Sequence, residues 1–316
     1  MKKTIVCAGA VFLALSLLLC GCGKTESFYT STRVMMGTYI EVQSPYQEAA
    51  GIVFSEFKRV EGLFNKYDPR SDVGRLNAQG KAAVQPETIR LIKKAGELWK
   101  ASSGAFDITV GPLVDLWGFT DKNYRVPAAD EITRALELVG FEKISIDEAG
   151  NVVEFSIPGM KIDLGGIAKG YALDCAASAL KQNGIDSCLI NAGGQVYALG
   201  TKRGDPWKVA IKDPRRQDLL DHLEVSDVSV STSGDYEQYF SAEGSRYSHI
   251  IDPRTGYPAQ SRVVSVTVVA ADAAAADALS TSIFVLGKEK GLLLAEGFGR
   301  IRAYIFEEEY FDAGTR

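Results

Sequence analysis

The stretch that decides the fold is residues 163–199, which read DLGGIAKGYALDCAASALKQNGIDSCLINAGGQVYAL. Its glycines open a helix expected over about 167–183, which Gly184 ends. Two short apolar strands follow, at 187–190 and 196–199, and only five residues separate them. Because parallel strands need a crossover of a dozen or more residues, so short a connection joins antiparallel neighbours. The stretch therefore predicts a hairpin beside a helix and not a regular βαβ repeat.

The rest of the chain mixes helices and strands in the same irregular way. Apolar spacing and cap residues predict four further helices, at 48–64, from Pro86 to about Trp99, from a cap at Asp130 to about Gly140, and at 273–286. Further strands are expected at 152–157, 207–212, 227–231, 263–270 and 300–306. No linker or fixed-period repeat divides these segments. We therefore expect one composite α+β domain with a mixed, largely antiparallel sheet and flanking helices.

Composition excludes several classes of protein. The chain has 316 residues, an apolar fraction of 46% and a net charge of −5, which excludes a disordered chain and a multi-span membrane protein. An acidic chain without a long basic run excludes nucleic acid as a partner. Two His and no paired Cys-x-x-Cys exclude a structural zinc cluster.

The N-terminus has the features of an export signal. Lys2 and Lys3 precede an apolar run from Ile5 to Leu19, which is shorter than the roughly 20 residues that a membrane span needs. Residues 19–22, Leu-Cys-Gly-Cys, resemble a bacterial lipobox, in which the last Cys is acylated and becomes the mature N-terminus. The departure from such motifs is Cys20, where Ala or Ser is more frequent. The alternative is a secreted protein cut nearby.

This resemblance implies an organisation for the whole chain. Residues 1–21 would be a lipoprotein signal peptide, Cys22 the lipidated residue, 22–27 a lipid-anchored tether and 28–316 the functional domain. The signal contains two Lys and no acid, so 33 basic and 40 acidic side chains remain, a net charge of −7. We expect the protein on the extracytoplasmic side of a bacterial cell membrane, held there by lipid and not by its own charge.

Cys175 and Cys188 are the cysteines left in the domain. A disulfide between them is permitted outside the cytoplasm. Cys175 lies in an Ala-rich helical stretch and Cys188 in an apolar strand, which favours two buried thiols.

The glycine-rich segment 163–170 is the first candidate for chemistry. The chain contains no G-x-x-x-x-G-K-[ST] loop and no G-x-G-x-x-G after a strand. In 163–170, glycines would let the main chain approach a ligand, the helix start would offer N–H groups to a phosphate, and Lys169 would add a cation. A tight turn without a ligand is the alternative.

A second candidate places three side-chain oxygens on one helical face. Asp277, Ser280 and Thr281 stand at positions i, i+3 and i+4. Oxygen ligands suit a hard cation such as Mg²⁺. Alternatively, the hydroxyls bond to their own helix and Asp277 faces solvent.

The third candidate is His249, which lies in YSHIIDPRTG at 247–256. An imidazole can act as a base near neutral pH, although a lone His with apolar neighbours is often structural. His222 lies in a charged stretch and is expected at the surface.

Together, these segments resemble the family of FAD:protein FMN transferases, the ApbE-type flavin transferases. The resemblance covers eight segments in order, MMGT at 35–38, NKYDP at 65–69, GAFDITVGPL at 104–113, DLGGIAKG at 163–170, NAGG at 191–194, STSGDY at 231–236, HIIDPRTG at 249–256 and ADALST at 276–281. They span nearly the whole mature body.

The resemblance implies a set of site residues. Mg²⁺ would be held by the main-chain carbonyl of Gly166 and by Asp277 and Thr281, with Ser280 close enough to assist. The positions where the family contacts FAD are Met36, Tyr67, Ala105, Phe106, Asp107, Asp163, Lys169 and Ile251. His249 is the residue expected to activate the acceptor, and Asp163 is the other candidate for that role.

The implied reaction is Mg²⁺-dependent transfer of the FMN moiety of FAD to a threonine hydroxyl of a target flavoprotein, through a phosphoester bond, with release of AMP. The acceptors would be exported or membrane-bound redox proteins. Two alternatives remain open, an exported FAD pyrophosphatase that forms FMN and AMP, and a flavin-binding lipoprotein without activity.

A serine hydrolase of the penicillin-binding kind is a rival from another class. The S-x-x-K matches at 55–58 and 178–181 and the RTG at 254–256 prompt it, but both tetrads lie in amphipathic helices without an S-D-N partner.

Overall fold

The computed structural model describes residues 27–216, 219–242 and 244–308. Its centre is a seven-stranded sheet, in the order β1 (Tyr29–Met35), β2 (Thr38–Ser44), β6 (Cys188–Ala192), β7 (Gln195–Leu199), β10 (Val228–Gly234), β13 (Val263–Ala270) and β14 (Arg302–Glu307). Every neighbouring pair in this sheet is antiparallel. The expected α+β class with a largely antiparallel sheet is confirmed, and no described pairing is parallel.

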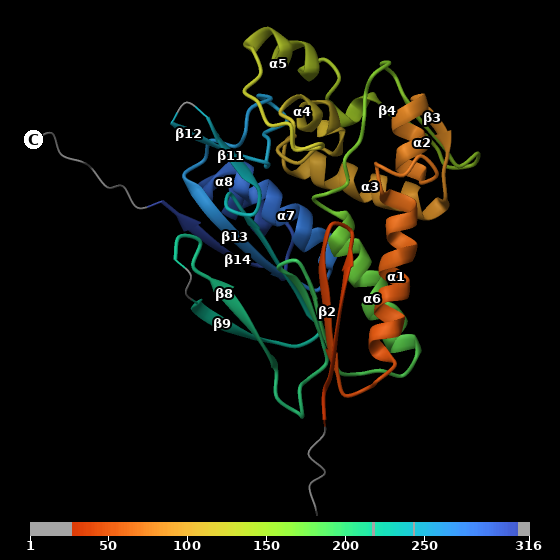
Figure 1. The fold of residues 1–316 in the computed structure, drawn as a ribbon, viewed down its shortest axis with the longest axis vertical. Helices are drawn as coiled ribbons and strands as arrows, with labels where there is room; N and C mark the ends of the chain where they lie inside the picture. Colours follow the sequence, from red (N-terminus) through yellow and green to blue (C-terminus); the bar gives the residue numbers. More distant parts are fainter. Residues whose placement is uncertain (1–26, 217–218, 243, 309–316) are drawn as a thin grey trace, which may run out of the picture.

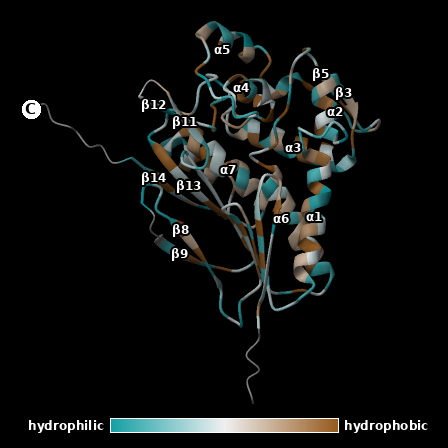
Figure 2. Ribbon diagram, viewed as in Figure 1, coloured by the Kyte–Doolittle hydropathy of each residue, from teal (hydrophilic) through white to brown (hydrophobic). Residues whose placement is uncertain are grey.

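Helices cover one face of the sheet and a hairpin covers the other (Figure 1). The helices are α1 (Ala49–Phe64), α6 (Ala168–Gln182) and α7 (Ala273–Leu286), with α8 (Lys288–Glu296) against α7. The hairpin consists of β8 (Trp207–Lys212) and β9 (Leu219–Val225), whose apolar residues form a second core with Val196, Val230 and Val269. Strand β13, between β10 and the edge strand β14, is buried throughout and mostly hydrophobic (Figure 2).

The remaining elements gather beyond one end of the sheet (Figure 1). They are α2 (Asp72–Gln79), α3 (Pro86–Ala101), η1 (Ile108–Val110), α4 (Gly111–Leu116), α5 (Ala129–Leu136), η2 (Phe141–Lys143), the small sheet β3 (Lys81–Ala83), β5 (Val152–Phe155) and β4 (Ile144–Asp147), and the hairpin of β11 (Tyr239–Ala242) and β12 (Ser245–Ser248). An aromatic cluster that includes Trp117, Phe119, Phe240 and Tyr247 fixes this hairpin.

The hairpin predicted after α6 is confirmed. Strands β6 and β7 pair from Cys188 with Leu199 to Ala192 with Gln195, and Gly193 and Gly194 form the two-residue turn between them. Their φ angles are 62° and 91°. Two consecutive positive φ angles are the geometry of a type I′ hairpin turn, which glycine adopts at little cost.

One predicted helix differs in detail. Helix α5 begins at Ala129 and ends at Leu136, so Asp130 lies in its first turn and is not the cap, and Gly140 lies beyond its end. The side chain of Glu131 accepts a hydrogen bond from the N–H of Ala128 at 2.9 Å. That contact fixes the cap at Ala128, two residues earlier than expected.

Cys175 and Cys188 are free thiols as expected, but only Cys188 is buried, whereas Cys175 is half-buried. Burial raises the pKa of Cys175 to about 11 and that of Cys188 to about 12, so both stay protonated near neutral pH. The predicted signal peptide and Cys22 lie outside the described residues. None of the helices described has the length and apolar character needed to cross a membrane.

Candidate active site

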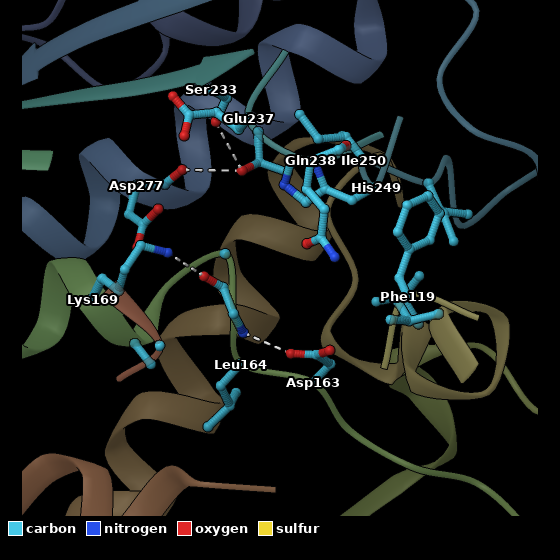
Figure 3. A pocket seen from close by; sticks show the side chains of 18 of the residues that line it. Phe119, Asp163, Leu164, Lys169, Ser233, Glu237, Gln238, His249, Ile250 and Asp277 are labelled. Carbon is cyan, nitrogen blue, oxygen red and sulfur yellow. Dashed lines mark hydrogen bonds between the residues drawn. The ribbon is translucent and has the colours of Figure 1, made fainter. Parts of the chain in front are cut away.

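A cavity of about 580 Å³ lies between the end of the seven-stranded sheet and the elements that gather beyond it, on the side covered by the helices (Figure 3). Segments far apart in the sequence line it. All eight residues predicted to contact FAD are among them, Met36, Tyr67, Ala105, Phe106, Asp107, Asp163, Lys169 and Ile251. The fold therefore gathers the predicted contacts around one space.

The four predicted metal ligands divide into two groups. Gly166, Asp277 and Thr281 line the cavity, as does His249. Ser280 does not. Its hydroxyl is fully buried behind the wall, 2.8 Å from the hydroxyl of Ser233.

The glycine-rich segment forms a tight passage from an extended stretch into α6. A Cβ on Gly166 would lie 3.2 Å from the Phe106 ring and 3.5 Å from Oγ1 of Thr281. A Cβ on Gly170 would lie only 2.2 Å from the carbonyl oxygen of Ala273, at the start of α7. These glycines allow the two helices and the cavity wall to approach one another.

The start of α6 offers fewer N–H groups to a ligand than expected. The N–H of Ala168 donates to the carbonyl of Leu164 at 2.8 Å, and that of Gly170 donates to Oδ2 of Asp277 at 3.0 Å. Lys169 Nζ donates to the carbonyl of Gly165 at 3.0 Å, which holds this ammonium at the cavity wall. This segment therefore presents the Lys169 ammonium to a phosphate more than it presents free N–H groups of the helix.

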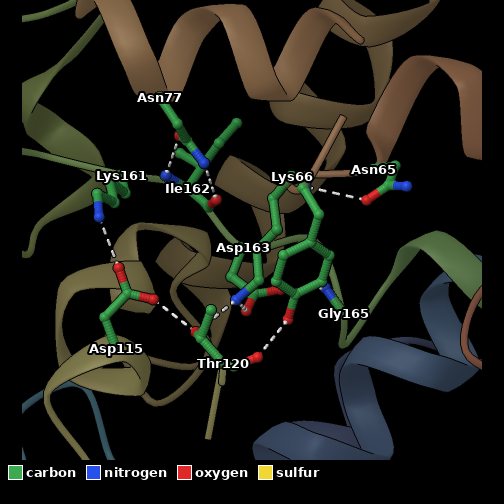
Figure 4. Close-up of polar contacts among 10 residues, drawn as sticks. Asn65, Lys66, Asn77, Asp115, Thr120, Lys161, Ile162, Asp163 and Gly165 are labelled. Carbon is green, nitrogen blue, oxygen red and sulfur yellow. Dashed lines mark hydrogen bonds and ion pairs between the residues drawn. The ribbon is translucent and has the colours of Figure 1, made fainter. Parts of the chain in front are cut away.

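At one end of the cavity, Asp163 has a cation of its own. Lys66 Nζ lies 2.7 Å from Oδ2 of Asp163 and 3.1 Å from the Thr120 hydroxyl, and the N–H of Gly165 donates to Oδ1 at 2.8 Å (Figure 4). Burial alone would favour the neutral acid, but Lys66 and Gly165 hold the pKa of Asp163 below its usual value. Asp163 is therefore ionised with both oxygens engaged, which suits it to positioning the loop better than to accepting a proton.

At the other end, Asp277 has no ion-pair partner among the described residues. It is 2% exposed, and its carboxylate accepts hydrogen bonds from the N–H of Gly170 and from Nε2 of Gln195. Burial raises the pKa of Asp277 above its usual value, against the opposing effects of Lys169 and of these two hydrogen bonds. Asp277 does not face solvent, so that alternative is excluded.

The hydroxyls beside Asp277 do bond to their own helix. Those of Ser280 and Thr281 donate to the Asp277 carbonyl at 2.8 and 3.3 Å. A hydroxyl that donates retains lone pairs, so Oγ1 of Thr281, beside Gly166, can still face a cation. No group of three or more His, Cys, Asp or Glu in the described part of the chain could hold a metal ion. A single carboxylate with neutral oxygens fits Mg²⁺ that takes its other ligands from water and substrate phosphates.

His249 lies at the cavity wall immediately after β12. Its Nδ1 is 3.0 Å from the carbonyl oxygen of Gln238, and because a carbonyl only accepts, Nδ1 carries the proton. The lone pair is then on Nε2. Burial lowers the pKa of His249, so the imidazole is neutral near pH 7. This is the form that a general base requires.

Other predicted contacts differ in what their side chains do. Met36 has a φ of 49° in the β1–β2 turn, and its N–H donates to Glu61 at 2.9 Å. Tyr67 is 63% exposed and offers a ring face beside the cavity. The Asp107 carboxylate is fully engaged by the N–H and hydroxyl of Thr109 and the N–H of Phe141, so it acts in shaping the wall.

Among the wall residues that sequence reasoning missed are Glu61, Lys66 and Gln195. Lys66 stands inside the NKYDP segment and Gln195 directly follows NAGG, so the motifs pointed to their neighbourhood. Glu61 carries no such signal, because only the fold brings the last turn of α1 to the β1–β2 turn.

Comparison with known proteins agrees with this arrangement. The family model described as "ApbE family" matches residues 36–305. A FAD:protein FMN transferase of Vibrio cholerae is 36% identical over 303 residues, which cover 90% of each chain. One of Treponema pallidum is 33% identical over 324 residues, covering 92% of this chain and 90% of the relative.

Solved structures extend the match to three dimensions. The ApbE protein of Thermotoga maritima superposes with a TM-score of 0.81 at 39% identity, covering 88% of this chain and 94% of that one. The flavin transferase ApbE of Vibrio cholerae gives 0.79 at 33% identity, with 89% and 94% covered. The chain therefore belongs to the ApbE family of FAD:protein FMN transferases.

Proposed function

We propose that the protein uses Mg²⁺ to transfer the FMN moiety of FAD to a threonine hydroxyl of a target flavoprotein, with release of AMP. One observation carries the metal dependence. Asp277 is a buried carboxylate in the cavity wall that meets only neutral hydrogen-bond donors within hydrogen-bonding distance. Buried charges in proteins are normally paired or bound to a metal.

The oxygens around Asp277 fit this ion. Mg²⁺ would be held by Asp277, by Oγ1 of Thr281 and by the Gly166 carbonyl, and would supply positive charge at the diphosphate of FAD. Ser280 supports this wall from behind through its bonds to Ser233 and to the Asp277 carbonyl. Lys169 adds a second positive charge at the same wall.

The chain's own residues account for the rest of the reaction. The threonine oxygen attacks the FMN-side phosphorus, the bond from that phosphorus to the bridging oxygen breaks, and AMP leaves with the bridging oxygen. The threonine proton passes to Nε2 of His249, whose Nδ1 is held by Gln238. The Asp163–Lys66 pair holds the glycine-rich loop in register with the cavity.

The same arrangement also suits a water molecule in place of threonine, which would make the protein an FAD pyrophosphatase. Storage of FAD without chemistry requires neither the lone carboxylate nor the neutral histidine. The serine-hydrolase rival has no support in the fold, because neither Ser55 nor Ser178 lines the cavity, and the Ser55 hydroxyl donates to the Gly51 carbonyl of its own helix.

We also propose that a lipid on Cys22 holds the enzyme at the extracytoplasmic face of the membrane, near exported or membrane-bound redox flavoproteins. The support is the sequence of residues 1–22. Cys22→Ser should move the protein from the membrane fraction to the soluble fraction. A variant that stays in the membrane fraction would contradict the anchor.

The function itself is tested by incubating the protein with FAD and Mg²⁺, with and without a threonine-bearing flavoprotein domain. The transferase predicts AMP release together with an FMN-sized mass gain on the domain, both abolished by a chelator. AMP without a mass gain would indicate the pyrophosphatase. FAD left intact under every condition would contradict both activities and favour storage.

A further inference from the structure

Gln195 carries a buried polar atom in the cavity wall that no described residue satisfies. The side chain is 4% exposed, and its Oε1 has no hydrogen-bond partner. The other two such atoms in the described chain, on Ser231 and Ser248, belong to residues that do not line the cavity. Because buried polar groups are nearly always partnered, an exception in a cavity wall indicates a ligand or ordered water there.

The position of Gln195 in the sheet explains what it reaches. It is the first residue of β7, directly after the Gly193–Gly194 turn. Alternate residues of a strand point to the same face, so Gln195 shares the helix-covered face with Tyr197 and Leu199, which belong to the main core. From that face its Nε2 donates to Oδ1 of Asp277.

The Nε2 and Oε1 atoms of the Gln195 amide face different groups. An ionised carboxylate only accepts hydrogen bonds, so the amide nitrogen must face Asp277 and Oε1 must face away from it. The N–H of Gly170 holds the other carboxylate oxygen at 3.0 Å. Asp277 is thus oriented from two sides by groups that carry no net charge.

We propose that Gln195 is a positioning residue of the cation site, whose Nε2 orients Asp277 and whose Oε1 accepts a hydrogen bond from a water ligand of the bound divalent cation. This inference rests on the proposed Mg²⁺ site. Mg²⁺ keeps several of its waters in protein sites. Groups that hold a ligand from behind typically contribute 10–100-fold to metal affinity.

The choice of an amide follows from charge. A lysine at this place would pair with Asp277 permanently, as Lys66 pairs with Asp163, and would take the place of the cation. A glutamate would put a second negative charge beside a carboxylate that is already buried. An amide holds Asp277 without cancelling the charge that attracts the ion.

The test is the Mg²⁺ affinity of the full chain, obtained from the rise of its thermal midpoint with Mg²⁺ concentration, in the presence of ADP as a diphosphate. Gln195→Leu removes both the unpartnered Oε1 and the Nε2 donor to Asp277, so its Mg²⁺ response is measured relative to its own midpoint without Mg²⁺. Its Kd for Mg²⁺ should weaken by about 10–100-fold. The matched control is Tyr197→Phe, which changes a polar group on the same face of β7 and should leave the Kd unchanged.

A second variant covers the case in which Gln195→Leu fails to fold. Gln195→Glu should lower the midpoint of the Mg²⁺-free protein, because two carboxylates are then buried together, and Mg²⁺ should raise that midpoint by more than it does for the wild type. A Gln195→Leu variant that binds Mg²⁺ as tightly as the wild type, or a Gln195→Glu variant that responds less than the wild type, would overturn the role of Gln195. Absence of Mg²⁺ binding by the wild type would instead overturn the proposed cation site.

Discussion

Asp163 and Asp277 are two largely buried carboxylates in the wall of one cavity. They differ in whether a cationic side chain is paired with them. Asp163 has the Lys66 ammonium at 2.7 Å, and its pKa lies below the usual value. Asp277 meets only the N–H of Gly170 and the amide of Gln195, and burial raises its pKa. The first charge is balanced within the fold, whereas the second is left for a ligand to balance.

The comparison predicts that the two carboxylates contribute to different properties. Removing one member of a buried ion pair is strongly destabilising because the other charge stays behind. Removing a carboxylate that has no ion-pair partner leaves no unpaired charge behind in the protein. Asp163 should therefore matter most for stability, and Asp277 for activity.

The largest expected effect is that of Asp277→Asn on AMP formation from FAD. The rate should fall by more than about 10⁴-fold, because several kcal/mol of charge stabilisation at the diphosphate are lost with the metal ligand. The thermal midpoint without Mg²⁺ should not fall. Rates measured at saturating FAD and Mg²⁺ check this, and a variant with nearly full activity would refute the cation site.

The next effect is that of His249→Ala on the transfer rate. Loss of a general base should slow transfer by about 10³-fold while FAD binding is retained. The matched control is His222→Ala, which removes the exposed imidazole on β9 and should leave the rate unchanged. An unchanged rate in His249→Ala would move the base to another group.

The pH dependence of the wild-type transfer rate also tests His249 as the general base. Only the neutral imidazole accepts a proton, and burial lowers the pKa of His249 from its usual value of about 6.5. The acidic limb of the pH–rate profile should therefore have its midpoint below about 6.5. A pH–rate profile whose acidic limb has its midpoint above that value would contradict this role.

A smaller effect, on stability, is expected for Asp163→Asn. The Lys66 ammonium would remain in a mostly buried position without its partner, which should cost about 3 kcal/mol in the free energy of unfolding. Denaturant unfolding measures this. The double variant Lys66→Met with Asp163→Asn should recover part of the loss, and a double variant less stable than Asp163→Asn alone would argue against the pair.

The smallest effect is that of Lys169→Ala on FAD affinity. One charge-assisted contact to a phosphate should change the Kd by about tenfold, or about 1.4 kcal/mol. Lys181→Ala, near the other end of α6, is the control and should bind FAD as the wild type does. Equal affinities of the two variants would remove Lys169 from the phosphate site.

Local sequence signals predicted much of the framework. The helices at 49–64, 168–182 and 273–286 and the strands at 207–212 and 263–270 follow from apolar period and caps. Strands β1 and β2 were not predicted, although they line the cavity with their turn at Met36. The residues of β1 are mostly exposed, so it lacks the alternation that reveals a half-buried strand.

The site was predictable as a set of motifs but not as a balance of charges. The motifs placed Asp163 and Asp277 in one pocket, and both stand between apolar residues in the sequence. Which of them has a cation is decided by Lys66, which lies 97 positions before Asp163 in the chain. The partner of Asp277 on β7 is 82 positions away. Such pairings depend on how the sheet and the helices pack, and no local pattern encodes them.

The most direct test of the central claim is calorimetric titration of Mg²⁺ into the wild type, Asp277→Asn and Asp163→Asn in the presence of ADP. The claim predicts binding by the wild type and by Asp163→Asn at a temperature where that variant is folded, and no measurable binding by Asp277→Asn. Equal Mg²⁺ affinity in Asp277→Asn and the wild type, or loss of binding in Asp163→Asn alone, would contradict it.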